Sequence, residues 1–96
     1  MSFILPIDRL LENHSWVAFY HPEPGYPLHI LLVPKRAIAD LMALNTGDSQ
    51  LLSDLIDIVQ RLILQFELQK RGYRLIANGG PYQSIPQFHF HLISEK

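Results

Sequence analysis

The segment Gln87-Phe88-His89-Phe90-His91-Leu92-Ile93 alternates polar and apolar side chains without a break. A period of two is typical of a β-strand, in which successive side chains point to opposite faces of the sheet. We therefore predict a strand from about Ile85 to Ser94. One face of this strand would carry apolar side chains. The other would carry an amide and two imidazoles in a row, spaced by roughly 6.6 Å.

Other parts of the chain predict the elements that surround this strand. Runs of β-branched and aromatic residues predict strands over 16–20, 29–33 and 73–77. The proline-rich segment 21–27 between the first two predicts a turn, and therefore an antiparallel hairpin. Apolar residues at steps of three and four predict a long amphipathic helix that begins after Asp48 as its N-cap and ends at Gly72.

Shorter helices are expected over 37–44 and, as a helical turn, over 4–12. Strands before and after one long helix favour an α+β fold, with an antiparallel sheet of about five strands. One long and one short helix would pack on one face of this sheet. We expect residues 1–96 to form a single domain.

Composition excludes several classes of protein. The net charge is −1 and no basic run occurs, so binding to nucleic acid is not expected. No stretch is long and apolar enough to span a membrane, and Met1-Ser2-Phe3-Ile4-Leu5-Pro6 does not have the features of a signal peptide. Cysteine is absent, which is consistent with a reducing compartment. We therefore expect a cytoplasmic protein.

The pair His89 and His91 has three interpretations that the residues alone leave open. A neutral imidazole can attack phosphorus and hold the transferred group covalently, while a neighbouring group fixes its tautomer and supplies a proton. Alternatively, the pair could bind zinc, for which His29 and His21 are the nearest further ligands. The third interpretation is the solvent-facing edge of an ordinary strand.

Polar residues just before the predicted strand favour the first interpretation. Asn78 ends the preceding strand, a Gly-Gly turn follows, and Gln83 and Ser84 come next. Backbone N–H groups and a hydroxyl at such a turn can bind phosphate oxygens. Together with two imidazoles, these groups predict an anion-binding site.

At these residues the chain resembles the histidine triad (HIT) family, whose signature His-φ-His-φ-His-φ-φ corresponds to residues 87–93, where φ is an apolar residue. The resemblance covers about Glu12 to Ile93. Residues 73–85 resemble the family's strand ending in Asn, its Gly-rich loop and its Gln-Ser pair. Residues 27–36 resemble the Pro-x-His-x-Leu-Val-φ-Pro-Lys end of its hairpin. Two motifs in the right order are more specific than either alone.

The resemblance implies an α+β nucleotide hydrolase or nucleotidyl transferase that acts at the α-phosphate through a covalent nucleotidyl-histidine. It implies no metal and no cofactor, and a homodimer formed through the long helix and an added strand. The broad apolar stripe of the predicted helix also favours a dimer. Carried over residue by residue, the catalytic positions are His89 as nucleophile, His91 and Gln87. The substrate-binding positions are His29, Asn78, Gln83, Ser84, Phe19 and His21.

The chain departs from the family pattern at three of these motif positions. Gln87 replaces the first triad histidine, and glutamine can hydrogen-bond but cannot carry a proton at neutral pH. His21 stands where an acidic ribose-binding residue is usual, and Ala37 where many members have another histidine. These departures favour an alternative function, a catalytically weakened nucleotide- or phosphate-binding module of the same fold. A metal-dependent hydrolase using His89, His91 and His29 is the third hypothesis.

Overall fold

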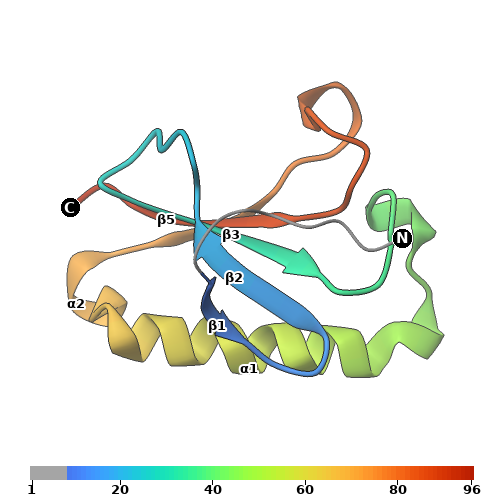
Figure 1. The fold of residues 1–96 in the computed structure, drawn as a ribbon, viewed down its shortest axis with the longest axis horizontal. Coiled ribbons are helices and arrows are strands. Elements are labelled where there is room, and N and C mark those ends of the chain that lie inside the picture. The colour runs from blue at the N-terminus through green and yellow to red at the C-terminus, as the bar shows by residue number, and fades with distance from the viewer. Residues whose placement is uncertain (1–8) are drawn as a thin grey trace.

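In the computed structural model of the chain, residues 9–96 are described, so residues 4–8 of the expected helical turn and the segment Met1–Pro6 lie outside the described residues. Five strands form one antiparallel sheet in the order β1-β2-β3-β5-β4 (Figure 1). The strands are β1 Arg9–Glu12, β2 Trp16–Tyr20, β3 Leu28–Pro34, β4 Arg74–Ala77 and β5 Phe90–Ser94. The helices are α1 Ser49–Gln65 and α2 Leu68–Arg71. The α+β prediction is therefore confirmed.

The central strands bring distant segments together in a defined register. β2 and β3 form the predicted hairpin, in which Phe19 lies opposite Leu31. β3 then pairs with β5, in which Leu31 lies opposite His91 and His29 lies opposite Ile93. Because directly opposed residues share a face of the sheet, His29, His91 and Phe19 all lie on the same face.

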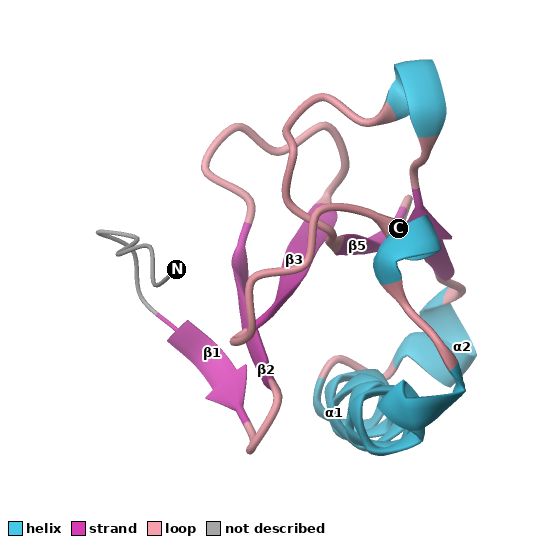
Figure 2. Ribbon diagram, turned by 90° about the vertical axis from the view of Figure 1, so that its right-hand side faces the viewer, coloured by secondary structure: helices cyan, strands magenta, loops and turns pink. Residues whose placement is uncertain are grey.

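The helices cover only one face of the sheet, as Figure 2 shows with α1 seen nearly end on. The apolar stripe of α1 and the alternate apolar residues of the central strands form one buried core. Trp16 is fully buried there, and its indole N–H donates to the Leu51 carbonyl oxygen at 2.8 Å. This contact joins β2 to the first turn of α1. The core residues are Trp16, Ala18, Leu28, Ile30, Leu32, Ile38, Leu51, Leu55, Ile58, Val59, Leu62, Leu68, Phe88 and Leu92.

Two predictions about the strands were wrong: a predicted helical turn proved to be a strand, and the last strand is shorter than predicted. Residues 9–12 form β1 and not a helical turn, because they pair with β2. The final strand begins at Phe90 and not near Ile85. Pro86 has no N–H to donate to a ladder, and the Phe88 N–H donates to the Ile38 carbonyl oxygen at 2.8 Å. The approach to β5 is thus bonded to the segment after β3.

The helix predictions needed three corrections. Residues 37–44 contain only a 3-10 turn at Leu41–Ala43. The helix after Asp48 ends at Gln65, because Glu67 adopts a left-handed conformation with φ 54°, and Gly72 ends α2 instead. Asp48 is the N-cap residue of α1 as predicted, but its carboxylate makes no capping hydrogen bond to the helix. It accepts hydrogen bonds from the Asn45 N–H at 2.9 Å and the Arg36 guanidinium at 2.8 Å.

Candidate active site

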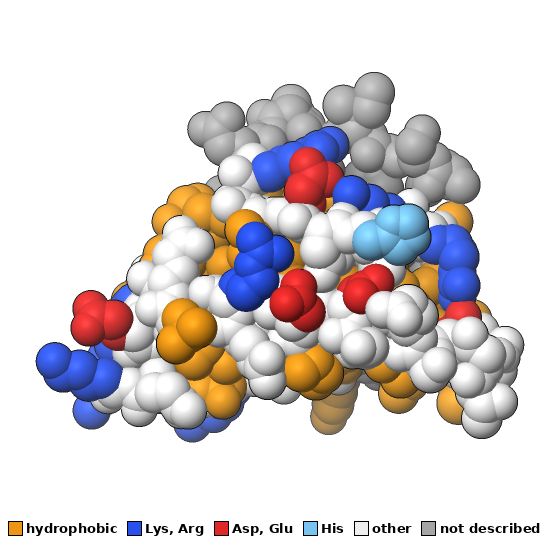
Figure 3. Space-filling model, turned by 90° about the horizontal axis from the view of Figure 1, so that it is seen from below, with side chains coloured by type: hydrophobic (Ala, Val, Ile, Leu, Met, Phe, Trp, Pro, Cys, Tyr) orange, Lys and Arg blue, Asp and Glu red, His pale blue; other side chains and the backbone are white. Residues whose placement is uncertain are grey.

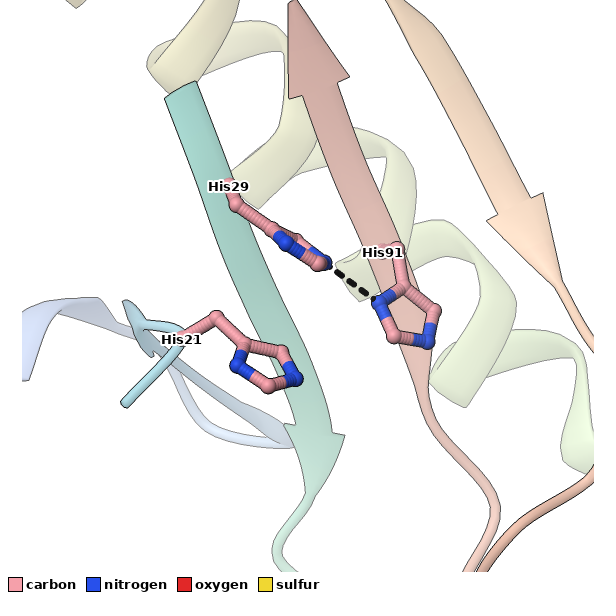
Figure 4. A group of neighbouring side chains, drawn as sticks. All are labelled: His21, His29 and His91. Atoms are coloured by element: carbon pink, nitrogen blue, oxygen red, sulfur yellow. Dashed lines mark hydrogen bonds between the residues drawn. The ribbon is translucent and has the colours of Figure 1, made fainter. Parts of the chain in front are cut away.

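Four histidines lie together on the face of the sheet that α1 does not cover. His29 comes from β3, His91 from β5, His21 from the loop just after β2, and His89 from the residue before β5. Figure 4 shows the rings of His21, His29 and His91 in front of the strands, with the helices behind. The rings of His89 and His91 have centroids 5.0 Å apart in an edge-to-face arrangement. The sequence prediction that His89 and His91 share one face is therefore confirmed.

A chain of hydrogen bonds fixes the protons of His29 and His91. The Gly25 N–H lies 3.0 Å from His29 Nδ1, so this nitrogen must accept. Neutral His29 therefore carries its proton on Nε2, which lies 2.8 Å from His91 Nδ1. His91 Nδ1 then accepts this proton, and neutral His91 carries its own on Nε2. The relay thus ends in an N–H donor.

His21 repeats this pattern beside the relay. The Glu23 N–H donates to His21 Nδ1 at 3.0 Å, so its proton also lies on Nε2. The ring of His21 stacks on that of His29, with centroids 4.3 Å apart and planes inclined by 29°. The same proline-rich loop therefore supplies both backbone donors that orient these two rings.

His89 has the opposite hydrogen-bond polarity. Its Nδ1 lies 2.8 Å from the Gln87 carbonyl oxygen, which can only accept. His89 Nδ1 therefore carries the proton, and Nε2 keeps a free lone pair. An imidazole nitrogen in this state is a nucleophile, whereas the relay rings present N–H groups.

Burial keeps the relay rings neutral. His29 is 9% exposed and His89 7% exposed, while His91 and His21 are partly buried. Burial and then the nearby positive charge of a protonated His89, His29 or His21 lower the pKa of His91 to about 4. Burial, and then His21, lower the pKa of His29. Among the ion pairs of residues 9–96 none includes a histidine, so no carboxylate offsets these effects.

The nitrogen atoms of His21, His29 and His91 lie within 4.8 Å of one another, a spacing that could suit a metal ion. A metal binds an imidazole nitrogen that carries no proton, and the other nitrogen then usually donates to an acceptor. Here backbone N–H groups lie against Nδ1 of His21 and His29, which puts the protons on the nitrogens that face the cluster. These hydrogen bonds favour an unmetallated cluster, and we assign no metal to it.

The side-chain amides of Gln83 and Gln87 donate hydrogen bonds to backbone carbonyl oxygens. The Gln87 side chain donates to the Phe88 carbonyl oxygen at 3.3 Å, so its backbone carbonyl, and not its amide, contacts His89. The Gln83 amide donates to the carbonyl oxygens of Ala39 at 2.7 Å and Ile85 at 2.9 Å. Gln83 therefore ties the Gly-rich loop to the segment after β3.

The remaining predicted residues occupy three different places in the described part of the chain, and the cavity that Ser84 lines includes no histidine. Exposed Ser84 lines a cavity of about 350 Å³ together with Gln83 and Asp40. Asn78 follows β4 and is partly buried. Phe19 is 3% exposed and occupies the same row across the sheet as His91, with Leu31 between them. Contacts of these residues with a nucleotide stay predictions.

Sequence reasoning missed the backbone donors at Glu23 and Gly25. Their side chains do not take part, so no residue type signals the role. The proximity of a Gly to a buried histidine emerges only when the loop folds back four residues, from His29 to Gly25. A β-carbon added at Gly25 would lie 3.9 Å from His29 Nδ1, an ordinary contact distance, so space alone does not require glycine.

Known proteins of one family are similar to this chain in sequence. Residues 5–96 match the HIT domain family. An uncharacterized HIT-like protein of Buchnera aphidicola is 32% identical over 95 residues, covering 97% of this chain and 85% of that protein. One from Synechococcus elongatus is 34% identical over 91 residues, covering 93% of this chain and 79% of that protein.

Solved structures share the fold. A HIT family hydrolase from Legionella pneumophila superposes with a TM-score of 0.88 at 30% identity, covering 96% of this chain and 84% of that one. A histidine triad nucleotide-binding protein from Candida albicans gives a TM-score of 0.83 at 28% identity, covering 96% and 68%. No helix within residues 9–96 has the length and apolar character needed to cross a membrane.

Proposed function

Because the chain belongs to the HIT domain family, we propose that it is a nucleotide hydrolase or nucleotidyl transferase that acts at an α-phosphate through a covalent nucleotidyl-His89. One observation carries the proposal: His89 Nδ1 lies 2.8 Å from the Gln87 carbonyl oxygen, which leaves the Nε2 lone pair free. Two of the similar structures are a HIT family hydrolase and a histidine triad nucleotide-binding protein, which supports the substrate class.

The reaction proceeds in two displacements. His89 Nε2 attacks the α-phosphorus, a P–N bond forms, and the bond to the leaving group breaks with its electron pair. The positive charge that develops on the ring is held by the Nδ1–H bond to Gln87. Water or another acceptor then attacks phosphorus, the P–N bond breaks, and the acceptor's proton passes to solvent.

The relay supplies the neighbouring hydrogen-bond donor. His91 Nε2–H projects from the same face as His89, and donors of this kind stabilise the charge on phosphate oxygens. Gln87 takes the place of the first triad histidine in the family signature. We propose that this exchange leaves His89 oriented, since the backbone carbonyl makes the contact.

The test is to trap the intermediate. The protein is mixed with an adenosine 5′-phosphate derivative, quenched in alkali and examined by intact-mass spectrometry. We expect a mass increase of one adenylyl group and the release of AMP, both absent in His89→Ala. His14→Ala, which alters an exposed histidine in the turn after β1, should behave as wild type. AMP release by His89→Ala would reject the nucleophile.

A second candidate is a nucleotide- or phosphate-binding module with weakened catalysis. Gln87 cannot carry a proton, and no histidine within residues 9–96 has a carboxylate partner, so the site has little means to assist departure of a basic group. Calorimetric binding of AMP without measurable release of AMP from any substrate would favour the module over the enzyme.

We also propose a homodimer. Leu52, Ile56 and Leu64 of α1 are 43%, 52% and 78% exposed, and β4 is an edge strand. Figure 3, which views the molecule from the α1 side, shows hydrophobic side chains interspersed with charged ones. A second copy would bury such residues and pair the free edge. Sedimentation equilibrium at micromolar concentration should give twice the chain mass, and a monomer would reject the proposal.

A further inference from the structure

The Gln83 amide uses both of its N–H groups on the protein itself. Its Nε2 donates to the Ala39 carbonyl oxygen at 2.7 Å and to the Ile85 carbonyl oxygen at 2.9 Å. A carboxamide has two N–H donors, and both partners here are acceptors, so these bonds identify which end of the amide is the NH₂ group. The other end, Oε1, can only accept. Gln83 therefore has no N–H left for a phosphate oxygen while both bonds are made.

The bond to Ala39 joins two segments that are far apart in sequence. Within residues 9–96, no other hydrogen bond joins the loop 79–86 to a distant part of the chain. Every residue of this loop except Gln83 is exposed, and a cavity of about 350 Å³ is lined by residues of the loop and by Ala39 and Asp40. Because packing does little to hold the loop, its position depends on the Gln83 amide.

The neighbouring carbonyl of the same segment binds the chain just before β5. The Phe88 N–H donates to the Ile38 carbonyl oxygen at 2.8 Å. Both residues belong to the core, since Ile38 is 5% exposed and Phe88 is 1% exposed. Two successive carbonyls, those of Ile38 and Ala39, thus hold two points of the chain that leads into β5. The first binds Phe88 and the second binds Gln83.

One planar peptide connects the Ile38 carbonyl to the proton of His89. The Gln87 carbonyl and the Phe88 N–H belong to the same trans peptide unit, so they point in opposite directions in one plane. The N–H is bonded to the Ile38 carbonyl oxygen, and the C=O to His89 Nδ1, each at 2.8 Å. Fixing the Ile38 end therefore fixes the direction of the Gln87 carbonyl, which places the proton of His89 on Nδ1.

We propose, on the basis of the function above, that Gln83 is a positioning residue for the nucleophile His89. Its amide holds the loop 79–86 in place, so that the Ile38 carbonyl keeps the Gln87–Phe88 peptide in the plane that orients the His89 ring. The contact on His89 is local, but the peptide that makes it is held by a segment fifty residues away. A contact between Gln83 Oε1 and a hydrogen-bond donor of the substrate is compatible with this role.

The first experiment removes the two donors and keeps the size of the side chain. Gln83→Met has no N–H for Ala39 or Ile85, whereas the control Tyr82→Ala alters a neighbouring side chain that is 83% exposed. Nitrophenolate release from adenosine 5′-(nitrophenyl phosphate) is followed in a single turnover, and the Kd of AMP is measured by calorimetry. We expect Gln83→Met to lower the single-turnover rate about 10- to 100-fold, with the Kd of AMP within about threefold of wild type. Tyr82→Ala should keep both values.

Two kinetic results would overturn the proposal. A single-turnover rate within about threefold of wild type in Gln83→Met would show that the amide does not position the nucleophile. An equal loss of rate and of AMP affinity would place Gln83 on the phosphate, because a residue that acts only through His89 should leave binding of AMP unchanged.

The second experiment locates the proton of His89, which a loss of stability alone would not move. Two-bond ¹H–¹⁵N correlation spectra at about pH 8, above the ordinary pKa of histidine, identify the protonated ring nitrogen. We expect Nδ1–H alone in wild type and in Tyr82→Ala, and a mixture of Nδ1–H and Nε2–H in Gln83→Met. Nδ1–H alone in Gln83→Met would overturn the proposal. Absence of an adenylyl intermediate in wild type would instead reject the function on which it rests, while the spectra still decide whether Gln83 controls the His89 ring.

Discussion

His89 and His91 are two residues apart, lie on one face of the chain and have ring centroids 5.0 Å apart, yet their hydrogen bonds have opposite polarity. His89 donates from Nδ1 to a backbone carbonyl two residues earlier, which frees Nε2 as a lone pair. His91 accepts at Nδ1 from His29, which makes Nε2 a donor. The difference shows that the partner of Nδ1, and not the residue type, decides what an imidazole can do in this site.

The two partners also differ in origin. The carbonyl that sets His89 belongs to the same segment of chain, so its position depends on the local path into β5. The relay that sets His91 begins at Gly25 in the hairpin loop and crosses from β3 to β5. The proton position of His89, the proposed nucleophile, is therefore set by a local contact, whereas that of His91 is set by contacts between distant segments. Four predictions test this contrast.

The largest effect is expected from removing the Nε2 lone pair of His89 while keeping a side-chain N–H that donates to the Gln87 carbonyl oxygen. His89→Asn retains a side-chain amide that can donate to the Gln87 carbonyl oxygen but has no nucleophilic nitrogen. We expect kcat to fall on the order of 10⁴-fold or more, with binding of AMP maintained. Single-turnover kinetics and calorimetry measure the two quantities. A loss of less than tenfold would mean that the attacking atom lies elsewhere.

A smaller effect is expected at His91, because another side chain can replace its Nε2–H donor. His91→Ala removes one hydrogen bond to the phosphate and should lower kcat about 10²- to 10³-fold. His91→Gln keeps an N–H donor but has no acid function, so it should stay within about tenfold of wild type. Comparison of His91→Ala with His91→Gln separates the effect of hydrogen-bond donation from that of acid catalysis. Equal, large losses in both variants would show that His91 supplies a proton.

The pH dependence of stability should show that His91 and His29 are neutral in the folded chain. The pKa of His91 is about 4 in the folded chain, against an ordinary value of 6.5, and the pKa of His29 is lowered as well. Between these values the unfolded chain binds more protons, so the free energy of unfolding should fall as the pH drops from about 6.5 to about 4. Urea titrations at several pH values measure this slope. His91→Gln should reduce it, and an unchanged slope would contradict the shifted pKa.

The contrast between local and tertiary contacts also explains which elements of the fold the sequence predicts. Alternation over 87–93 placed His89 and His91 on one face correctly, because side-chain direction depends on period alone. The hairpin over β2 and β3 was also predictable, since a proline-rich turn separates two runs of strand-forming residues. The start of β5 was not, because the bond between Phe88 N–H and the Ile38 carbonyl oxygen joins segments fifty residues apart in sequence.

The shared face of His89 and His91 could be predicted from the sequence, but the positions of the protons on the histidine rings could not. His29 and His91 were identified from motifs, yet the state of each depends on main-chain groups that no residue type reveals. The same limit applies to Gln83. The resemblance to the family made Gln83 a substrate-binding position, and in the folded loop its amide donates to the carbonyl oxygens of Ala39 and Ile85. A contact between Gln83 and a substrate stays a prediction. Side-chain identity predicts which groups can take part, and tertiary contacts decide the role.

The smallest effect is expected from changing the side chain next to the nucleophile. The Gln87 amide donates to the Phe88 carbonyl oxygen at 3.3 Å, a long hydrogen bond, while the backbone carbonyl of Gln87 orients His89. Gln87→Ala keeps that carbonyl, so kcat should change by less than about threefold. Gln87→His should keep or raise the rate for the same reason. Gln87→Pro is a harsher comparison, since it alters the backbone that carries the carbonyl. If Gln87→Ala lost as much activity as His91→Ala, the orientation of His89 would depend on the amide, and local specification by the main chain would be wrong.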